Sequence, residues 1–307
     1  MRMSAGSRST LALILAAAAW GTGTAVSKRA VTEIPPLTLL PIQLAASLGV
    51  LVVLMRIRGV PLTEPGVPSI LGRLGILNPG IAYGLSLLGL THLDASISVL
   101  LWALEPILIL VLAAWILSER VGPLVLVLSS VAVAGIFVVA YQPGAAGNPL
   151  GVGLTVAGVL CCAIYTIINR RWIGASDGTA AVVASQQAHA LVVSGGLAIV
   201  LWIAGGAVVP GAISGPGWVS AVGSGVLYYG LAYWLYLSAL RSVPAPLAAA
   251  SFYLVPVFGI GASFLFLGER LDPGQWFGVA VVALAVLGIL WRRSTPAGAS
   301  APLMSPP

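Results

Sequence analysis

The chain contains ten stretches of about 20 mostly apolar residues, and no other feature of the sequence restricts its fold as strongly. A helix of about 20 residues is what crossing the hydrocarbon core of a bilayer requires. In lipid, runs of this length satisfy their backbone hydrogen bonds as helices, which excludes open strands. We place the spans at 9–28, 36–55, 70–90, 95–117, 121–141, 150–170, 179–204, 217–240, 244–267 and 273–291. The sequence therefore predicts an all-α integral membrane protein.

Composition supports this assignment and excludes several classes of protein. Hydrophobic residues make up 59% of the chain and charged residues 7%, whereas a soluble domain carries roughly 25% charged residues. The net charge of +6 is therefore attributed to basic residues that flank the spans and set their orientation in the membrane. No nucleic-acid partner is expected. Two adjacent cysteines, two histidines and eight acids give no disulfide framework and no zinc spacing. We expect no metal, no cofactor and no enzymatic nucleophile–base pair.

The positions of the basic residues predict the orientation of the chain. With the N-terminus inside and ten spans, eleven lysines and arginines fall on the inner side and three on the outer side. Such an excess is typical of cytoplasmic segments, so both termini are expected in the cytoplasm. The first span resembles a signal peptide, but we expect it to be retained because the charge count requires it.

An internal repeat appears when the chain is shifted by 150 positions. A proline in mid-span followed thirteen residues later by Glu-Arg occurs twice, and Tyr83 aligns with Tyr233. Because each copy holds five spans, an odd number, the second copy must be inverted in the membrane. We expect a first repeat at 1–145, a second at 146–293 and a disordered tail at 294–307, which is rich in Pro, Ser and Ala.

These motifs resemble those of the drug/metabolite transporter superfamily, in particular its ten-helix members with two EamA repeats, over residues 10–292. The matching segments are Ala19-Trp20-Gly21, Leu104-Glu105-Pro106 with Ser118-Glu119-Arg120, and Leu254-Val255-Pro256 with Gly268-Glu269-Arg270. Among such proteins, amino-acid exporters, including aromatic amino acid exporters of bacteria, are the nearest in kind. The resemblance implies export of a small solute. The second copy has Val255 where the first has Glu105, so an acid there is not common to both halves.

Glu105 is the one acid inside an expected span, near its middle. An ionisable residue at that depth is a functional hypothesis by default. It would serve as counter-charge to a substrate amine or carry a coupling proton. The alternative is a neutral carboxyl bonded to backbone that Pro106 frees. Ser98, Trp102 and Glu105 follow helical spacing and would share one face, which suits an amino-acid-like solute or plain helix packing.

Other polar and aromatic residues recur in mid-span, where a phenol or indole needs a partner. Small residues such as Gly21 and Gly23 beside them would also permit simple helix packing. We expect the cavity walls to come from the first, third, fourth, sixth, eighth and ninth spans, with the fifth and tenth as scaffold. The expected substrate-binding residues are Trp20, Thr24, Asn78, Tyr83, Ser98, Trp102, Glu105, Tyr165, Asn169, Tyr229, Tyr233 and Tyr253.

A second group of polar residues is assigned to structure. Glu119-Arg120 and Glu269-Arg270 are expected to anchor helix ends, and Cys161-Cys162 to fill space as small apolar residues. Lys28 and Arg29, on the side with few basic residues, suggest a gate, but we favour the simpler interpretation that their side chains extend towards water. Gln186, Gln187 and His189 are expected to bond across helices or to line a path.

Taken together, the sequence predicts a secondary transporter of a bacterial inner membrane that exports small metabolites, amino acids above all, by alternating access through a central cavity. A multidrug or nucleoside carrier of the same superfamily is the first alternative, and a membrane-embedded lipid-modifying enzyme is the second. The expected partners are a small-molecule substrate and membrane lipid. A monomer suffices for this scheme, and the sequence leaves the oligomeric state open.

Overall fold

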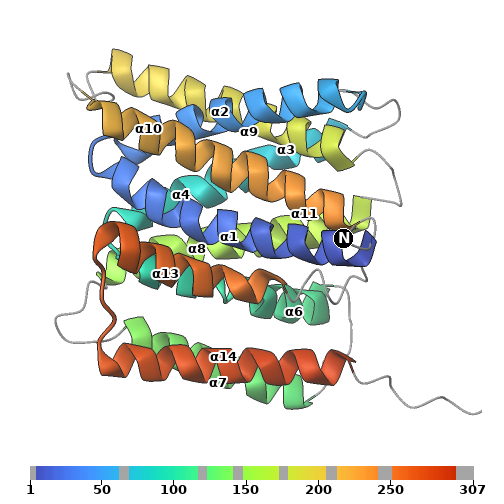
Figure 1. Ribbon diagram of the computed structural model, residues 1–307, viewed down its shortest axis with the longest axis vertical. Coiled ribbons are helices and arrows are strands. Elements are labelled where there is room, and N and C mark those ends of the chain that lie inside the picture. The colour runs from blue at the N-terminus through green and yellow to red at the C-terminus, as the bar shows by residue number, and fades with distance from the viewer. Residues whose placement is uncertain are drawn as a thin grey trace, which may run out of the picture.

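The computed structural model describes residues 5–61, 69–116, 123–140, 148–172, 179–204, 213–240 and 251–294. Over these residues the chain is helical, without a β-sheet, and its helices run side by side in one bundle (Figure 1). The prediction of an all-α fold is confirmed. Four unbroken stretches among the described residues are long and apolar enough to cross a bilayer: Arg8–Val31, Pro36–Ile57, Pro149–Ile168 and Ala180–Ile203.

The described helices form ten rods that follow the expected spans. Six rods are single helices: α1 (Ala5–Val31), α2 (Pro36–Ile57), α7 (Pro123–Ala140), α8 (Pro149–Trp172), α9 (Thr179–Ile203) and α14 (Pro273–Ser294). Four rods are bent or broken: α3 (Ser69–Gly75) with η1 (Ile76–Ile81) and α4 (Ala82–Leu90); α5 (Ala95–Trp102) with α6 (Glu105–Ile116); α10 (Gly215–Ser224) with η2 (Gly225–Leu231) and α11 (Ala232–Leu240); and η3 (Phe252–Leu254) with α13 (Val255–Leu267).

The irregular turns occupy the same places in the two halves of the chain. The wide turn η1 in the third rod corresponds to η2 in the eighth, and the break at 103–104 in the fourth rod corresponds to η3 in the ninth. In η1 the irregularity centres on Asn78, whose backbone leaves helical geometry at φ −144° and ψ 116°, and on Pro79, which lacks a backbone N–H. The chain is thus two inverted five-helix repeats, as predicted.

Two of the bent rods, the third and the eighth, each cross a neighbouring helix at a glycine. A side chain on Gly75 would overlap the carbonyl of Gln186 in α9, and a Cβ on Gly225 would stand 2.5 Å from the carbonyl oxygen of Gln43 in α2. Only glycine permits helix backbones to approach so closely. The third and eighth rods are held by the same device, one from each repeat.

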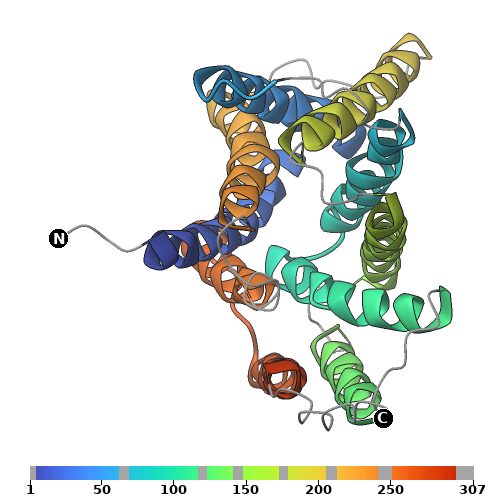
Figure 2. The same cartoon turned by 90° about the vertical axis from the view of Figure 1, so that its right-hand side faces the viewer.

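Helices α7 and α14 lie apart from the solute-sized space in the middle of the bundle. They pack mainly on each other, with the backbone of Gly135 close to the carbonyl of Gly278. Both views show this pair at the edge of the bundle (Figures 1 and 2). Their position matches the expectation that the fifth and tenth spans are scaffold.

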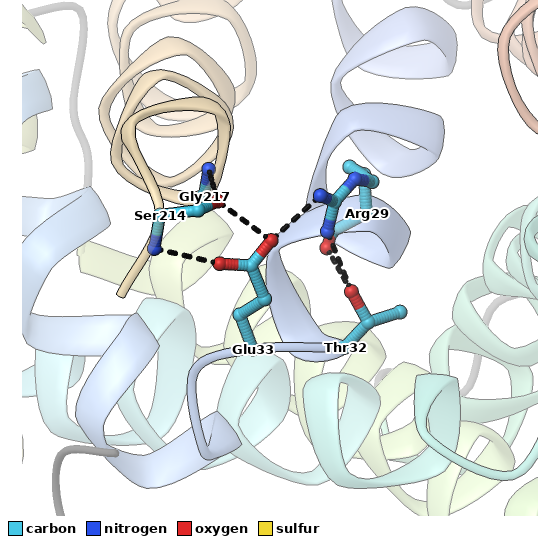
Figure 3. Close-up of polar contacts among 5 residues, drawn as sticks. All are labelled: Arg29, Thr32, Glu33, Ser214 and Gly217. Carbon is cyan, nitrogen blue, oxygen red and sulfur yellow. Dashed lines mark hydrogen bonds and ion pairs between the residues drawn. The ribbon is translucent and has the colours of Figure 1, made fainter. Parts of the chain in front are cut away.

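One end of the bundle, which we call the latch end, is tied together by two carboxylates. The carboxylate of Glu33 follows α1 and accepts hydrogen bonds from the backbone N–H and hydroxyl of Ser214, each at 2.9 Å, at the start of α10 (Figure 3). The carboxylate of Glu269 follows α13 and accepts bonds from the N–H of Ala95 and from the N–H and hydroxyl of Ser96, at 2.7 to 2.9 Å. In each case a carboxylate from one repeat caps a helix N-terminus in the other, where it satisfies free N–H groups.

Basic residues complete the latch end. Arg29 forms an ion pair with Glu33 at 2.6 Å, and Lys28 Nζ donates to the carbonyls of Leu90 and Leu93 at 2.8 and 2.5 Å. The Lys28 side chain therefore bonds to backbone within the protein and does not simply extend towards water. Burial raises the pKa of the neighbouring Asp94. The structural role expected for Glu269 agrees with these contacts, whereas Glu119 and Arg120 lie outside the described residues.

Candidate functional site

A cavity of about 270 Å³ opens in the middle of the bundle, among aromatic side chains. We call it the aromatic cavity. The residues around it come from the first, third, fourth, sixth, eighth and ninth rods, the six spans named from the sequence. They are Trp20, Thr24, Asn78, Tyr83, Val99, Trp102, Ala103, Glu105, Cys162, Tyr165, Thr166, Tyr228, Tyr233, Tyr236, Phe252, Val255 and Pro256.

Two stacked ring pairs frame the aromatic cavity. Trp20 of α1 stacks on Phe252 of η3, and Tyr83 of α4 stacks on Trp102 of α5, each with ring centroids 5.1 Å apart. Tyr233 joins the two pairs, because its ring meets Trp20 edge-on at 5.5 Å while its hydroxyl lies 3.4 Å from that of Tyr83. Offset and edge-on contacts of this kind favour fixed ring positions. The cavity wall is thus a connected aromatic frame.

Glu105 is the acidic residue of the aromatic cavity and begins α6 directly after the break in the fourth rod. The break positions it: the N–H groups of Ala103 and Leu104 donate to carbonyls three residues back, those of Leu100 and Leu101, each at 3.0 Å. The thiol of Cys162 in α8 donates to Glu105 Oε1 at 3.2 Å. A thiol is a weak donor, so among the described residues the carboxyl meets no cationic partner.

The Cys162 contact corrects the sequence interpretation. Cys162 was expected to be a small packing residue, yet it lines the aromatic cavity beside the acid. The contact that the structure shows for Glu105 is this one, and not the bond to a carbonyl freed by Pro106 that was the alternative. Spacing within one span cannot reveal a partner 57 residues away on another helix.

Asn78 owes its place to the kink in η1, which turns a polar amide into the wall of the aromatic cavity. It is 3% exposed, and its Oδ1 has no hydrogen-bond partner among the described residues. A buried amide oxygen without a partner is unfavourable by roughly 1–3 kcal/mol. The cavity therefore contains an acceptor for a hydrogen-bond donor.

Tyr165 and Thr24 line the aromatic cavity but already have intramolecular partners. The Tyr165 hydroxyl donates to Gln186 Oε1 at 2.7 Å, and the Thr24 hydroxyl donates to the Trp20 carbonyl at 3.2 Å. Gln186 and the adjacent Gln187 bond across helices as expected, to the carbonyls of Leu71 and Tyr229. His189 instead contacts the carbonyl of Ser185 in its own helix, so the expectation of an interhelical bond is not met.

Two expected residues, Ser98 and Tyr229, lie elsewhere. Both are almost fully buried and border a space of only about 20 Å³ on the side of the latch end, together with Ser86 and Ser27. The carbonyl of Tyr229 accepts from Gln187 Nε2 at 3.0 Å within the wide turn η2. The side chains of Asn169 and Tyr253, both also expected, lie outside the described part of the chain.

The list of expected substrate-binding residues omitted several aromatic and small residues of the wall, namely Tyr228, Tyr236, Phe252, Thr166 and Cys162, although Tyr236 shares a helical stripe with Tyr229 and Tyr233. Tyr228 is the repeat-mate of Asn78, both at the wide turns, so the 150-residue shift could have identified it. Nothing comparable marks Phe252, because its role follows from stacking on Trp20.

The aromatic cavity lies away from the latch end. Its wall includes Tyr165 near the end of α8, and Phe252 at the start of the ninth rod. Towards the latch end, the rings of Tyr83, Tyr228 and Tyr229 contact one another with centroids 5.0 to 5.3 Å apart. We call these three rings, with Trp102, the aromatic plug. It separates the cavity from the carboxylate contacts at the latch end.

Comparison with known proteins agrees with this architecture. A solved crystal structure titled only as a protein matches with a TM-score of 0.67 and 19% identity, over 94% of this chain and 99% of the matched chain. At that identity the likeness shows the fold alone. No match was found among curated proteins. The model of the EamA-like transporter family matches residues 7–141 and 149–291. The chain therefore belongs to the EamA-like transporter family and is a multi-pass membrane protein with two EamA repeats.

Proposed function

We propose that the protein is a secondary transporter that exports small metabolites, foremost amino acids with aromatic or apolar side chains. The observation that carries the proposal is Glu105, a carboxyl set among aromatic rings in a solute-sized cavity. In the ionised form it attracts the ammonium group of an amino acid, and ring faces add attraction for a nearby cation. The apolar part of the solute packs against the Trp20–Phe252 and Tyr83–Trp102 pairs.

The size of the aromatic cavity supports a small solute over a large one. Pockets for drug-sized ligands usually measure about 300–1,000 Å³, and this one measures about 270 Å³. Asn78 Oδ1 and the phenols of Tyr83 and Tyr233 supply an acceptor and donors for the polar groups of an amino acid. A multidrug carrier is the second candidate, favoured by the aromatic frame and disfavoured by this volume.

In the proposed mechanism the cavity is reached alternately from the two sides of the membrane. In this conformation the latch end is closed by Glu33, Glu269 and the aromatic plug. Exchange requires the repeats to rock, with the bent rods acting as hinges. We assign the latch end to the outer side of a bacterial inner membrane and both termini to the cytoplasm, on the basis of the distribution of basic residues.

Counterflow in proteoliposomes tests the proposal directly. Vesicles preloaded with one amino acid are given a radiolabelled amino acid outside, and the panel includes aromatic, aliphatic and charged amino acids, a nucleoside and a cationic dye. We expect accumulation of labelled aromatic or aliphatic amino acids in vesicles with the protein and none in empty vesicles. Accumulation of only the dye or the nucleoside would favour the second candidate. No accumulation with any solute would contradict the proposal.

A further inference from the structure

A second and larger space, which we call the lateral groove, runs along the outside of α13. It measures about 1,000 Å³ and lies between α13, α14 and the first half of α1. Its lining is almost wholly apolar, and several of its side chains are well exposed, including Val257 and Trp276. The lining also includes Leu13, Ile14, Leu100, Ala103, Pro256 and Gly261, with Glu269 and Arg270 at the latch end.

The lateral groove and the aromatic cavity share part of their walls. Ala103 and Pro256 border both spaces. Ala103 is the smallest side chain with a Cβ, so the partition at that point is thin. On one side it faces the lipid-exposed groove, and on the other it is two residues from Glu105.

Both shared residues lie at breaks in their rods, where the backbone has few bonds to lose. Ala103 and Leu104 bond to carbonyls only three residues back, and Val255 bonds in the same way to Phe252. Pro256, like Pro106, has no N–H to donate. Short turns of this kind inside a longer helix commonly mark hinges. The partition therefore lies at the irregular turns of the fourth and ninth rods.

From these observations we propose that the partition at Ala103 and Pro256 is a lateral portal, through which a solute with an apolar body and a protonated amine passes between the bilayer and the aromatic cavity. The apolar body occupies the lateral groove while the amine approaches Glu105 through the partition. This inference rests on the proposed function, because it takes the aromatic cavity as the solute site, and it adds a route that does not cross the water phase.

The portal predicts that access of a solute to the aromatic cavity depends on the length of its alkyl chain. Each added methylene favours transfer from water to an apolar phase by about fourfold. A solute that arrives from the bilayer therefore becomes more effective as its alkyl chain grows, whereas one that arrives from water does not. Closing the lateral groove must remove this dependence without altering the binding of short amines.

The experiment uses two amines that carry a photoreactive diazirine, one with an ethyl chain and one with a decyl chain. The full-length protein in phosphatidylcholine vesicles is irradiated with each, and the labelled residues are mapped by mass spectrometry. We expect the ethyl amine to label the aromatic cavity, at residues such as Trp20 and Trp102. We expect the decyl amine to label both that cavity and the lateral groove, at residues such as Val257 and Trp276.

Two groove-filling variants test the route. Gly261 lines the lateral groove and has no atom within 4 Å of an added Cβ, so Gly261→Leu adds side-chain volume to the groove without backbone overlap at its Cβ. Val257→Trp fills the groove from another exposed position, so the test remains valid if Gly261→Leu does not fold. Gly49→Leu is the matched control, because Gly49 in α2 also has open space around it but lies outside the groove lining. We expect both groove variants to lose cavity labelling by the decyl amine and to keep labelling by the ethyl amine.

The outcomes separate the portal from the proposed function. If the decyl amine labels residues of the lateral groove alone, the groove is only a docking site for lipid-like molecules, and the portal proposal is wrong. Unchanged cavity labelling in Gly261→Leu and Val257→Trp would also overturn it, while cavity labelling by the ethyl amine upholds the solute site. If neither amine labels the aromatic cavity, the portal and an amine-binding solute site are both wrong.

Discussion

The hydroxyls of Tyr83 and Tyr233 lie 3.4 Å apart, although the two residues are 150 positions apart in the chain and occupy the same place in the two repeats. Residues related by a two-fold axis approach each other only when they lie near that axis. The pseudo-symmetry axis of the inverted repeats therefore passes between these two phenols. It meets the wall of the aromatic cavity, as expected for a site where inverted repeats meet.

The first prediction concerns the hydroxyl of Tyr233. Tyr233→Phe keeps the ring contact with Trp20 and removes the bond to Tyr83, so we expect a loss of about 0.5 kcal/mol in stability. Tyr233→Ala also removes the ring that joins the two stacked pairs, and transport should fall well below that of Tyr233→Phe. Thermal unfolding and counterflow measure the two effects. Leu284→Ala, at a lipid-exposed position of α14, is the control and should transport normally.

Glu105→Gln tests whether the carboxyl acts in transport. The amide keeps a similar shape and loses the charge, so the protein should fold normally. A bond to a charged group contributes about 1.5–3 kcal/mol, and its loss should lower the apparent affinity for an amine-bearing solute by about tenfold to a hundredfold. Any pH dependence of counterflow between pH 5 and 9 that arises from the Glu105 carboxyl should also disappear in the variant. Wild-type affinity, rate and pH profile in the variant would leave Glu105 a structural residue.

Cys162→Ser serves as the companion of that experiment. A hydroxyl replaces the thiol that donates to Glu105, and hydroxyls are the stronger donors. We expect this variant to fold and to bind solute, with an affinity changed far less than in Glu105→Gln. A loss as large as that of Glu105→Gln would mean that the position, and not the charge, determines binding.

Glycine at position 225 should be essential to the bend of the eighth rod. A Cβ there would lie 2.5 Å from the Gln43 carbonyl oxygen, so Gly225→Ala must separate α2 from η2. Overpacking of this kind typically destabilises by about 1–3 kcal/mol. Gly223→Ala, two residues earlier and with no atom within 4 Å, should instead stabilise the helix by up to about 1 kcal/mol. Thermal unfolding of the two variants in detergent should shift in opposite directions.

The latch end should loosen in acid. The bonds from Ser214, and then the Arg29 contact, lower the pKa of Glu33 from its usual value of 4.5. A carboxyl with a lowered pKa in the folded state stabilises that state at higher pH and loses the effect as pH falls through the lowered value. The protection of the backbone amides at the start of α10 against hydrogen exchange, taken relative to the intrinsic rate at each pH, should therefore fall below pH 4.5 and stay high at neutral pH.

Two variants separate this contact from general acid unfolding. Gly217→Ala places a Cβ 2.5 Å from Glu33 Oε2, so it should open the same contact at neutral pH. Glu33→Gln should show low protection of these amides at every pH. Wild-type protection in both variants would mean that other contacts hold the latch end.

Orientation in the membrane can be checked with cysteine labelling in intact cells, in a background that lacks Cys161 and Cys162. A cysteine at Thr32, in the latch end, should react with a membrane-impermeant maleimide. A cysteine added at the C-terminus should react only after lysis. Reaction of the C-terminal cysteine in intact cells would contradict the assignment of both termini to the cytoplasm.

The sequence predicted the all-α fold, its ten rods and the inverted repeat, because apolar length and the spacing of Glu-Arg and proline are local features. It misplaced residues where a rod departs from regular helix. Ser98, Trp102 and Glu105 share one face of an ideal helix, yet the break after Trp102 leaves Ser98 beside the smaller space. The wide turn η2 likewise turns Tyr229 away from the side that Tyr233 faces.

The aromatic plug has a consequence for the energetics of the cell. Its rings contact one another directly across the path between the aromatic cavity and the latch end, at centroid distances near 5 Å. No file of water molecules can thread such a contact, and protons and small ions cross proteins along such files. In this conformation the protein should be electrically silent, so a cell can carry many copies without dissipating its membrane potential.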